Sequence, residues 1–402
     1  MKSLLILGRQ PALGLAELES LYGAKVLKPL FPNAVLVDLP AKEIDFKRLG
    51  GSIKLTTVLN ILHSTNWKDI EVYLQKMVPE HLQYVPAEGK FHLGLSAYGL
   101  KVHPGDINST ALRLKKLIKE TRPVRVIPNK TQALSSAQVI HNQLTGDTGW
   151  ELVFYRNGQD TILCLTVMEQ DIEAYSARDQ NRPKRDAKVG MLPPKLAQII
   201  INLAVDRVQG SGLRAQSDKI TILDPFCGTG VILQEALLMG YSVYGSDIEP
   251  RMVEYSLENL DWLRIRMNGD YDIRLEPGDA IRHNWALGPE PSALVVAAET
   301  YLGKPLSREP NEAFLKPIIA ECDQIHRGFL SNFARQARPG TRLCLAVPAW
   351  RYKNGFKHLK TLDYLRELGY TRIDLKLAPA SDLIYFRPDQ FVARELVVLV
   401  KD

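Results

Sequence analysis

Three short stretches of the chain contain residue types from which a small-molecule site can be built. The first is the turn DPFCGTG at residues 224–230, where Gly228 and Gly230 allow unusual backbone dihedrals and a close approach of a ligand. Asp247 follows Gly230 by 17 residues, where a carboxylate can accept hydrogen bonds from both hydroxyls of a ribose. Further on, Asp279 either takes a hydrogen bond from an adenine amino group or only caps the end of its strand, and the sequence does not decide between the two. Together these residues describe a site for an adenosine without phosphates.

A dinucleotide site shares this outline but needs a third glycine in the turn. A full GxGxxG pattern would place glycine at position 233, and the residue there is Leu233. This argues against a pyrophosphate ligand.

A further stretch, VVAAETYLG at residues 295–303, is an apolar run that stops at Glu299. Glu299 is either a catalytic carboxylate at a strand end or the first polar residue of a turn. We favour the functional interpretation, because ligands of α/β sheets bind at the carboxyl ends of the strands.

The elements that must position these residues alternate between strand and helix, which is typical of a doubly wound parallel sheet and predicts an α/β fold. Pro193 and Pro194 open a long helix before the first strand, since proline is tolerated in a first helical turn. The last two strands have no helix between them, so we expect them to pair antiparallel. Arg394 and Glu395 begin the last strand, and we expect an ion pair between them at the sheet edge. The predicted strands are 220–224, 242–247, 273–276, 293–298, 341–347, 372–377 and 395–401.

The chain ahead of this sheet predicts two smaller α+β domains. Short apolar runs around an amphipathic stretch indicate an N-terminal domain over residues 1–60, and strand-like segments that frame two helical ones indicate a second over residues 61–175. Residues 176–192 are charged and irregular, which fits a linker or loop. The sheet domain then occupies residues 193–402.

Positive charge is concentrated in the second domain. Residues 101–130 hold eight Lys and Arg residues against Asp106 and Glu120, a surplus as large as the net charge of +6 of the whole chain. A second basic cluster lies at residues 178–195. Such local patches suit a polyanion such as a nucleic acid, although a solvated helix face has the same pattern. In the helix expected over residues 108–121, the apolar face would contain Leu112, Leu114, Leu117 and Ile118.

Composition excludes several classes of protein. No apolar run approaches the roughly 20 residues that a membrane span needs, and the N-terminal apolar segment is too short for a signal peptide, so we expect a cytoplasmic protein. The four cysteines are scattered without a CxxC pair, which argues against a zinc site or a disulfide framework. We therefore expect no metal.

With these motifs in place, the chain resembles the class I S-adenosylmethionine-dependent methyltransferases. DPFCGTG resembles the form found in RNA and DNA amino-methylases, and RDQNRPKRDAKVGMLPPKLAQIIINLA resembles the element before it in tRNA guanosine methyltransferases with a THUMP domain. Residues 61–175 are similar to a THUMP domain. The domain order resembles that of the archaeal and eukaryotic enzymes that make N2-methylguanosine at position ten of tRNA.

The resemblance implies roles for particular residues. It implies S-adenosylmethionine as cofactor, with cofactor contacts at Gly190, Met191, Leu192, Asp224, Cys227, Gly228, Gly230, Asp247, Ile248, Asp279 and Ala280. It implies tRNA as the partner, and the basic residues that we expect to contact RNA are Arg113, Lys115, Lys116, Lys119, Arg122, Arg125, Lys130 and Arg185. Nothing in the sequence decides whether a small activator subunit is needed.

The catalytic turn departs from the family's pattern. The amino-methylases carry Asp or Asn, two prolines and an aromatic there, whereas this chain has Glu299, Thr300, Tyr301 and Leu302 before Gly303. We expect Glu299, Thr300 and Tyr301 to form the catalytic turn, with Tyr301 able to stack on a base. Two alternatives follow: an RNA-binding homologue with impaired catalysis, or an enzyme that methylates another tRNA guanosine or ribosomal RNA.

Overall fold

The fold was analysed in a computed structural model of the 402-residue chain. It describes residues 2–402 apart from 87, 187–191, 206–219, 268–271, 288–292, 307 and 353–354. The described residues divide into two compact units. The first comprises Met1–Pro11, Lys25–Lys47 and Ser52–Ala174, and the second comprises Ala12–Ala24, Arg48–Gly51 and Tyr175–Asp402.

The first unit is built on one eight-stranded sheet in the order β2-β3-β1-β4-β8-β7-β5-β6. Its strands are β1 (Ser3–Leu7), β2 (Leu27–Leu30), β3 (Ala34–Val37), β4 (Ser52–Leu62), β5 (Phe91–Tyr98), β6 (Val124–Val126), β7 (Gly149–Asn157) and β8 (Asp160–Glu169). Strand β4 runs through residue 60 and joins strands from both sides of it. The predicted domain boundary at that residue therefore does not coincide with a break in the sheet, and the division into two α+β domains stays a prediction.

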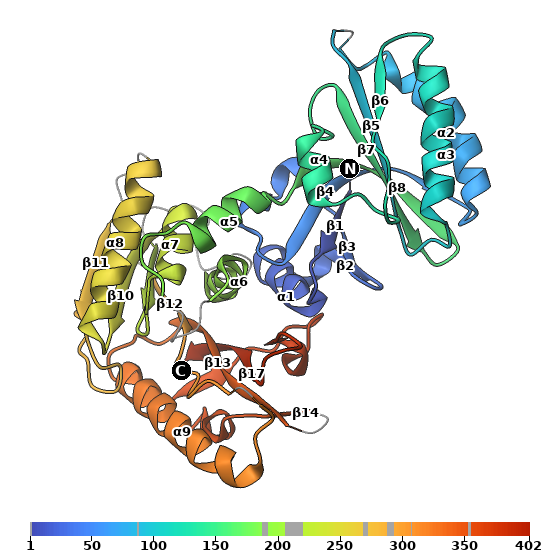
Figure 1. Cartoon of the computed structure of the whole chain (residues 1–402). Helices are drawn as coiled ribbons and strands as arrows, with labels where there is room; N and C mark the ends of the chain where they lie inside the picture. Colours follow the sequence, from blue (N-terminus) through green and yellow to red (C-terminus); the bar gives the residue numbers. More distant parts are fainter. Residues whose placement is uncertain are drawn as a thin grey trace. The chain divides into compact units, whose positions relative to one another are not determined.

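Two helices, α2 (Trp67–Leu82) and α3 (Pro104–Ile118), lie side by side against the β5–β7 part of this sheet (Figure 1). The buried face of α3 contains Ile107, Ala111, Leu114 and Ile118, which recur at the spacing of one helix face. The expected apolar face was wrong at Leu112, which is 53% exposed. The short helix α4 (Ser136–His141) begins with a capping box at Ser135.

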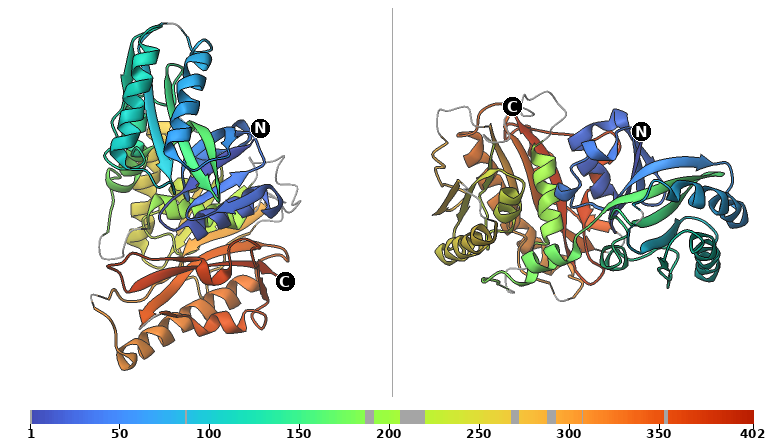
Figure 2. Two further views of the ribbon diagram at one scale, coloured as in Figure 1. Left: turned by 90° about the vertical axis from the view of Figure 1, so that its right-hand side faces the viewer. Right: turned by 90° about the horizontal axis from the view of Figure 1, so that it is seen from above.

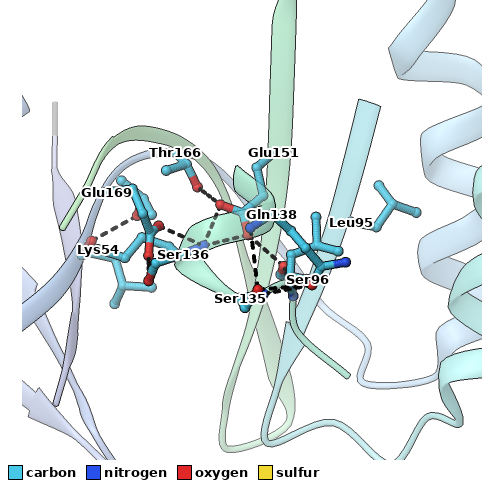
Figure 3. Close-up of polar contacts among 12 residues, drawn as sticks. Lys54, Leu95, Ser96, Ser135, Ser136, Gln138, Glu151, Thr166 and Glu169 are labelled. Atoms are coloured by element: carbon cyan, nitrogen blue, oxygen red, sulfur yellow. Dashed lines mark hydrogen bonds and ion pairs between the residues drawn. The ribbon is translucent and has the colours of Figure 1, made fainter. Parts of the chain in front are cut away.

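A buried ion cluster crosses this sheet (Figure 3). The Lys54 ammonium on β4 contacts both Glu151 on β7 and Glu169 on β8, and all three side chains are at most 2% exposed. The Glu151 carboxylate also accepts hydrogen bonds from Ser96 Oγ at 2.6 Å and Thr166 Oγ1 at 2.5 Å. Burial raises the pKa of Glu169. The three charges lie on β4, β7 and β8, and the hydrogen bond from Ser96 adds β5, so the cluster links four adjacent strands through buried side chains.

The second unit contains the predicted doubly wound sheet, and that prediction is confirmed. Its strand order is β11-β10-β9-β12-β13-β17-β15, with β9 to β13 parallel and β17 antiparallel to β13 and β15. Two short strands lie off this path: β14 (Gly355–Lys357) pairs antiparallel with β13, and β16 (Ile384–Tyr385) pairs antiparallel with β17. The main strands are β9 (Ile220–Asp224), β10 (Ser242–Asp247), β11 (Ile273–Pro277), β12 (Ala293–Glu299), β13 (Arg342–Tyr352), β15 (Tyr370–Arg372) and β17 (Val392–Lys401).

Helices cover both faces of this sheet (Figure 2). One face packs against α6 (Pro194–Val205), α7 (Val231–Leu238) and α8 (Pro250–Met267), and the other against the long helix α9 (Glu312–Ala334). The helix α5 (Ile172–Gln180) leads into this unit, so the first residues of the predicted loop 176–192 are helical. Two apolar layers thus hold the strand ends in place.

Helix α1 (Pro11–Tyr22) groups with the second unit because buried polar contacts fasten it there. Glu17 accepts hydrogen bonds from the Gly50 and Gly51 amides, both at 2.9 Å, and from Asn202 Nδ2 at 2.7 Å. Burial raises the pKa of Glu17 to about 7. Glu19 accepts from the amides of residues 376 and 377. These two amides therefore bond to Glu19 and not to a neighbouring strand, and the strand predicted at 372–377 ends at residue 372.

Candidate active site

The glycine turn lies between the end of β9 and the start of α7. Gly228 has a φ of 50° and Gly230, the N-cap of α7, a φ of 81°, both in the left-handed region that favours glycine. A Cβ on Gly230 would meet Ser256 Oγ at 3.0 Å and Ser256 Cβ at 3.2 Å. Ser256 Oγ donates to the Gly228 carbonyl at 2.8 Å. The turn therefore depends on glycine both for its dihedrals and for the close approach of α8.

Asp247 ends β10, the strand next to β9, and is tied to this turn. Its Oδ2 accepts a hydrogen bond from the Gly228 amide at 2.9 Å, and its Oδ1 accepts one from the Glu249 amide at 3.0 Å. Burial raises the pKa of Asp247, with a smaller contribution from the charge of Glu249. The following residue, Ile248, is 64% exposed. A fixed carboxylate beside an open apolar surface suits a ribose and an adjoining flat ring.

Asp279 and Ala280 follow β11, the next strand outward. The Asp279 carboxylate accepts from the Ile281 amide at 3.1 Å and pairs with Arg282 Nε at 3.0 Å. Ala280 is buried, and its carbonyl accepts from Asn332 Nδ2 at 3.1 Å. Asp279 thus stabilises its own turn, and its contact with an adenine stays a prediction.

Asp224 and Cys227 belong to this turn, but their side chains are buried. The buried Asp224 carboxylate accepts from the Phe226 amide at 3.1 Å, and burial, followed by the charges of Asp247 and Glu299, raises its pKa far above the usual range. Burial likewise raises the pKa of the Cys227 thiol. Cys227 therefore packs as a neutral small side chain, which is unsuited to a nucleophile.

Glu299 ends β12, which lies between β9 and β13. Asp224, Asp247 and Glu299 are each the last residue of a strand, so three carboxylates meet at one edge of the sheet. The Glu299 side chain is 18% exposed, and its Oε1 accepts a hydrogen bond from Arg394 Nε on β17. Within the described part of the chain, Glu299 Oε2 has no hydrogen-bond partner.

The expected pairing of Arg394 with Glu395 is wrong. Neighbouring residues of a strand point to opposite faces of the sheet. Arg394 accordingly reaches Glu299 on one face, whereas Glu395 pairs with Arg372 Nη2 at 3.0 Å and with His358 on the other.

Thr300 and Tyr301 are held by side-chain bonds in a turn that lacks the family's prolines. The buried Thr300 donates its amide to the Ala346 carbonyl at 3.1 Å, and its hydroxyl lies 2.6 Å from His326 Nε2. His326 Nδ1 lies 2.6 Å from the Cys322 carbonyl, so Nδ1 carries the proton and Nε2 accepts from Thr300. Burial lowers the pKa of His326 to about 4, which keeps the ring neutral. Tyr301 donates its hydroxyl to Glu321 at 3.1 Å.

Two residues that contact this turn, His326 and Arg394, were not predicted from the sequence as site residues. His326 lies 26 residues after Thr300 on α9, and Arg394 lies 95 residues after Glu299. No local motif marks either one. Only the strand order, which brings β17 within reach of β12 across β13, could have pointed to Arg394.

The segment that precedes α6 is fastened to the glycine turn. The Lys184 amide donates to Asn259 Oδ1 at 2.9 Å, and Asn259 Nδ2 donates to the carbonyls of Lys184 at 3.0 Å and Thr229 at 2.9 Å. Of the expected cofactor contacts in this region, Gly190 and Met191 lie outside the described residues. Leu192 is buried in the apolar layer of α6 and α7.

The basic residues of the first unit differ in how they are presented. Lys116, Lys119, Arg125 and Lys130 are exposed, and Lys115 is half-buried. Arg113 is exposed but forms an ion pair with Glu71, and this contact lowers the pKa of Glu71. Arg122 is buried over the Phe91 ring and donates to the carbonyls of residues 88 and 89. In the second unit, Arg185 is exposed and donates to the Gln180 carbonyl at 3.3 Å. Five basic residues form no ion pair or side-chain hydrogen bond within the described residues and are therefore best placed for phosphate: Lys115, Lys116, Lys119, Arg125 and Lys130.

Among the residues that the structure describes, no helix has the length and apolar character to cross a membrane. No group of three or more His, Cys, Asp or Glu side chains among the same described residues is arranged to hold a metal ion.

Comparison with known proteins gives partial matches. The chain is 33% identical over 159 residues to a tRNA (guanine(10)-N2)-dimethyltransferase of Methanothermobacter thermautotrophicus, a match that covers 40% of this chain and 39% of that relative. It is 41% identical over 91 residues to the enzyme of the same name from Pyrococcus abyssi, covering 23% of this chain and 22% of that relative. Each match thus spans well under half of the curated relative. No family model matches the chain.

Among solved structures, TrmN from Thermus thermophilus aligns over the full length of both chains with a TM-score of 0.52 and 17% identity. At that identity the likeness concerns the fold alone. It agrees with the doubly wound sheet described above.

Proposed function

We propose that this protein is a tRNA methyltransferase that transfers a methyl group from S-adenosylmethionine to the 2-amino group of a guanosine, at position ten of tRNA. The observation that carries the proposal is the placement of Glu299, one strand from the glycine turn, with one carboxylate oxygen unpartnered in the described part of the chain. The partial matches to enzymes named for this reaction support the choice of nucleotide.

The residues of the glycine turn fit the cofactor. Asp247 presents a half-buried carboxylate, fixed by backbone amides, for the ribose hydroxyls, and Ile248 offers an exposed apolar surface for the adenine. A Cβ on Gly228 would have the Phe226 carbonyl, at 3.9 Å, as its nearest neighbour, so the space beside this glycine is open and a ligand can approach the backbone closely. When bound, S-adenosylmethionine supplies a methyl group on a positively charged sulfur, which is already activated for transfer.

The protein's own contribution is to prepare the amino group. The lone pair of a guanine 2-amino nitrogen is delocalised into the ring, so this nitrogen is a weak nucleophile. Glu299 Oε2 can accept one of its N–H groups, which raises electron density on nitrogen and provides an acceptor for the proton that must leave. The backbone of the turn that carries Glu299 is fixed through Thr300 and His326 at the strand end. Alignment of nitrogen with the methyl group then supplies much of the rate.

We assign RNA binding to residues 61–175, the THUMP-like part of the first unit, in a cytoplasmic enzyme. Phosphate contacts position an RNA without reading its sequence, and Lys116, Lys119, Arg125 and Lys130 are exposed for that purpose. Arg122 is an exception, because its guanidinium is engaged by Phe91 and two carbonyls of its own chain.

The test is incubation of the protein with labelled S-adenosylmethionine and an unmodified tRNA transcript, followed by mass spectrometry of the nucleosides. The proposal expects N2-methylated guanosine from the wild type and none from Glu299→Ala. A cofactor titration provides the control, since Glu299→Ala should bind S-adenosylmethionine as well as the wild type does. Methylation of a different nucleoside would contradict the assignment.

A second candidate, an RNA-binding homologue without methyl transfer, is favoured by one observation. The turn lacks both prolines and the aromatic that the amino-methylases carry, and Tyr301 is bonded to Glu321. Tight binding of cofactor and tRNA with no incorporation of label would support this candidate and refute the first.

A further inference from the structure

Arg394 is a buried arginine that reaches the candidate catalytic carboxylate from two strands away. Its side chain is 8% exposed, and its Nε donates to Glu299 Oε1. The register pairs Glu299 with Ala346 on β13, and Pro348 of β13 with Arg394 of β17. All four residues therefore lie on one face of the sheet, and the small Ala346 side chain leaves room for the arginine to cross β13.

The pair leaves one acceptor and several donors unused in the described part of the chain. Within the described residues, Glu299 Oε2 has no hydrogen-bond partner, and neither do the two terminal nitrogens of the Arg394 guanidinium. Arginine holds a carboxylate through fixed, planar donors, which limits how the carboxylate can turn. One oxygen is thus held while the other remains available as an acceptor.

The turn needs such a device because it lacks the usual one. Two consecutive prolines would fix φ at two positions after the acidic residue, and this chain has Thr300 and Tyr301 there instead. Glutamate also has one more rotatable bond than aspartate, so its carboxylate has more positions to choose from. The bond from Thr300 to His326 fixes the backbone of the turn, but it does not reach the Glu299 carboxylate.

We propose that Arg394 is the positioning residue for Glu299, and that it does for this turn what the missing prolines would do. The inference rests on the proposed function, because it assigns Arg394 a part in orienting the acceptor of the amino proton. Arg394 acts through Glu299, so its loss should lower the rate of methyl transfer without weakening the binding of S-adenosylmethionine. A displacement of the carboxylate by about 1 Å costs on the order of 100-fold in rate.

The experiment measures kcat for methyl transfer to tRNA, KM for S-adenosylmethionine and cofactor affinity for variants of Arg394 and Glu299 and for one control variant. Arg394→Met is expected to lower kcat about 100-fold while cofactor affinity stays within about threefold of the wild type. Arg394→Lys, which keeps a cation but not the planar fork, should recover part of that loss. Glu299→Gln should lower kcat far less in the Arg394→Met background than in the wild type, because the effects of two residues that act as a unit are not additive.

Arg372 provides a matched control on the same sheet. It pairs with Glu395, the neighbour of Arg394 on β17, but on the opposite face. Arg372→Met removes a comparable arginine–glutamate pair and should leave kcat within a fewfold of the wild type. An equal loss of kcat in Arg372→Met and Arg394→Met would overturn the inference, because a general packing role would explain both.

Other outcomes are equally decisive. A kcat for Arg394→Met within threefold of the wild type, or above it, would overturn the positioning role while the proposed function stands. Absence of methyl transfer by the wild type would overturn the proposed function and this inference with it. If Arg394→Met does not fold by circular dichroism, Arg394→Lys decides: the inference requires a reduced kcat with unchanged cofactor affinity, and unchanged kcat contradicts it.

Discussion

The buried ion cluster of the first unit should be the most sensitive point of its sheet. Lys54 contacts Glu151 and Glu169, and none of the three side chains is more than 2% exposed (Figure 3). Lys54→Met removes the cation and leaves two carboxylates without their countercharge. Removal of one partner from a buried pair costs about 3–5 kcal/mol.

Hydrogen exchange measured by mass spectrometry reads this loss locally, which suits a chain of two units. A deficit of about 3–5 kcal/mol corresponds to exchange that is faster by roughly 100- to 4,000-fold, since each 1.4 kcal/mol is about a factor of ten. The effect should appear in peptides from β4, β7 and β8, which carry the three charges, and not in the second unit.

The pH dependence has a defined sign. Burial raises the pKa of Glu169 above its usual value, while Lys54 opposes that shift. Without Lys54 the pKa rises further, so the folded variant takes up a proton more readily than the unfolded chain does. The deficit of Lys54→Met should therefore shrink as pH falls below 7 and the carboxylate is neutralised.

Two controls separate charge from packing. Lys54→Met combined with Glu151→Gln should recover part of the lost protection, because one uncompensated charge is gone. Lys2→Met, at an exposed pair with Asp38 in the same unit, should change stability by less than about 1 kcal/mol. Exchange in Lys54→Met within a fewfold of the wild type would refute the reasoning.

Three further predictions concern the catalytic unit and RNA. Because burial lowers the pKa of His326 from 6.5 to about 4, stability should fall as pH drops from 6.5 to 4, and His326→Gln should flatten this fall in urea titrations. Gly245→Val would bring a Cβ to 2.5 Å from Leu233 Cδ1, so it should destabilise the second unit by about 1–3 kcal/mol in the same assay. Affinity for tRNA should fall steeply with salt concentration in binding titrations, and joint replacement of Lys115, Lys116 and Lys119 should reduce this dependence. An affinity independent of salt would contradict RNA binding.

Local pattern was sufficient to predict most of the second unit's sheet. The strands at 220–224 and 242–247 have the predicted bounds, because each is a short apolar run closed by a turn signal. The glycine turn was predictable for the same reason, since its dihedrals require particular residues at adjacent positions. The antiparallel pairing of the last two strands is confirmed as well.

What the sequence did not reveal depends on contacts between distant residues. Arg394 contacts Glu299 across the intervening strand β13, and His326 on helix α9 accepts a hydrogen bond from Thr300. The strand predicted at 372–377 ends at residue 372, and Glu19, more than 350 residues away, accepts hydrogen bonds from the amides of residues 376 and 377. Periodicity reports which face of an element is buried, but it does not report which distant side chain completes a hydrogen bond.

The measurement that tests the central claim most directly is methyl transfer to a tRNA that differs by one amino group. Two transcripts are compared with labelled S-adenosylmethionine, one with guanosine at position ten and one with inosine there, which lacks the 2-amino group. The account predicts incorporation into the guanosine transcript, loss of that incorporation in Glu299→Ala, and none into the inosine transcript. Equal incorporation into both transcripts would contradict it.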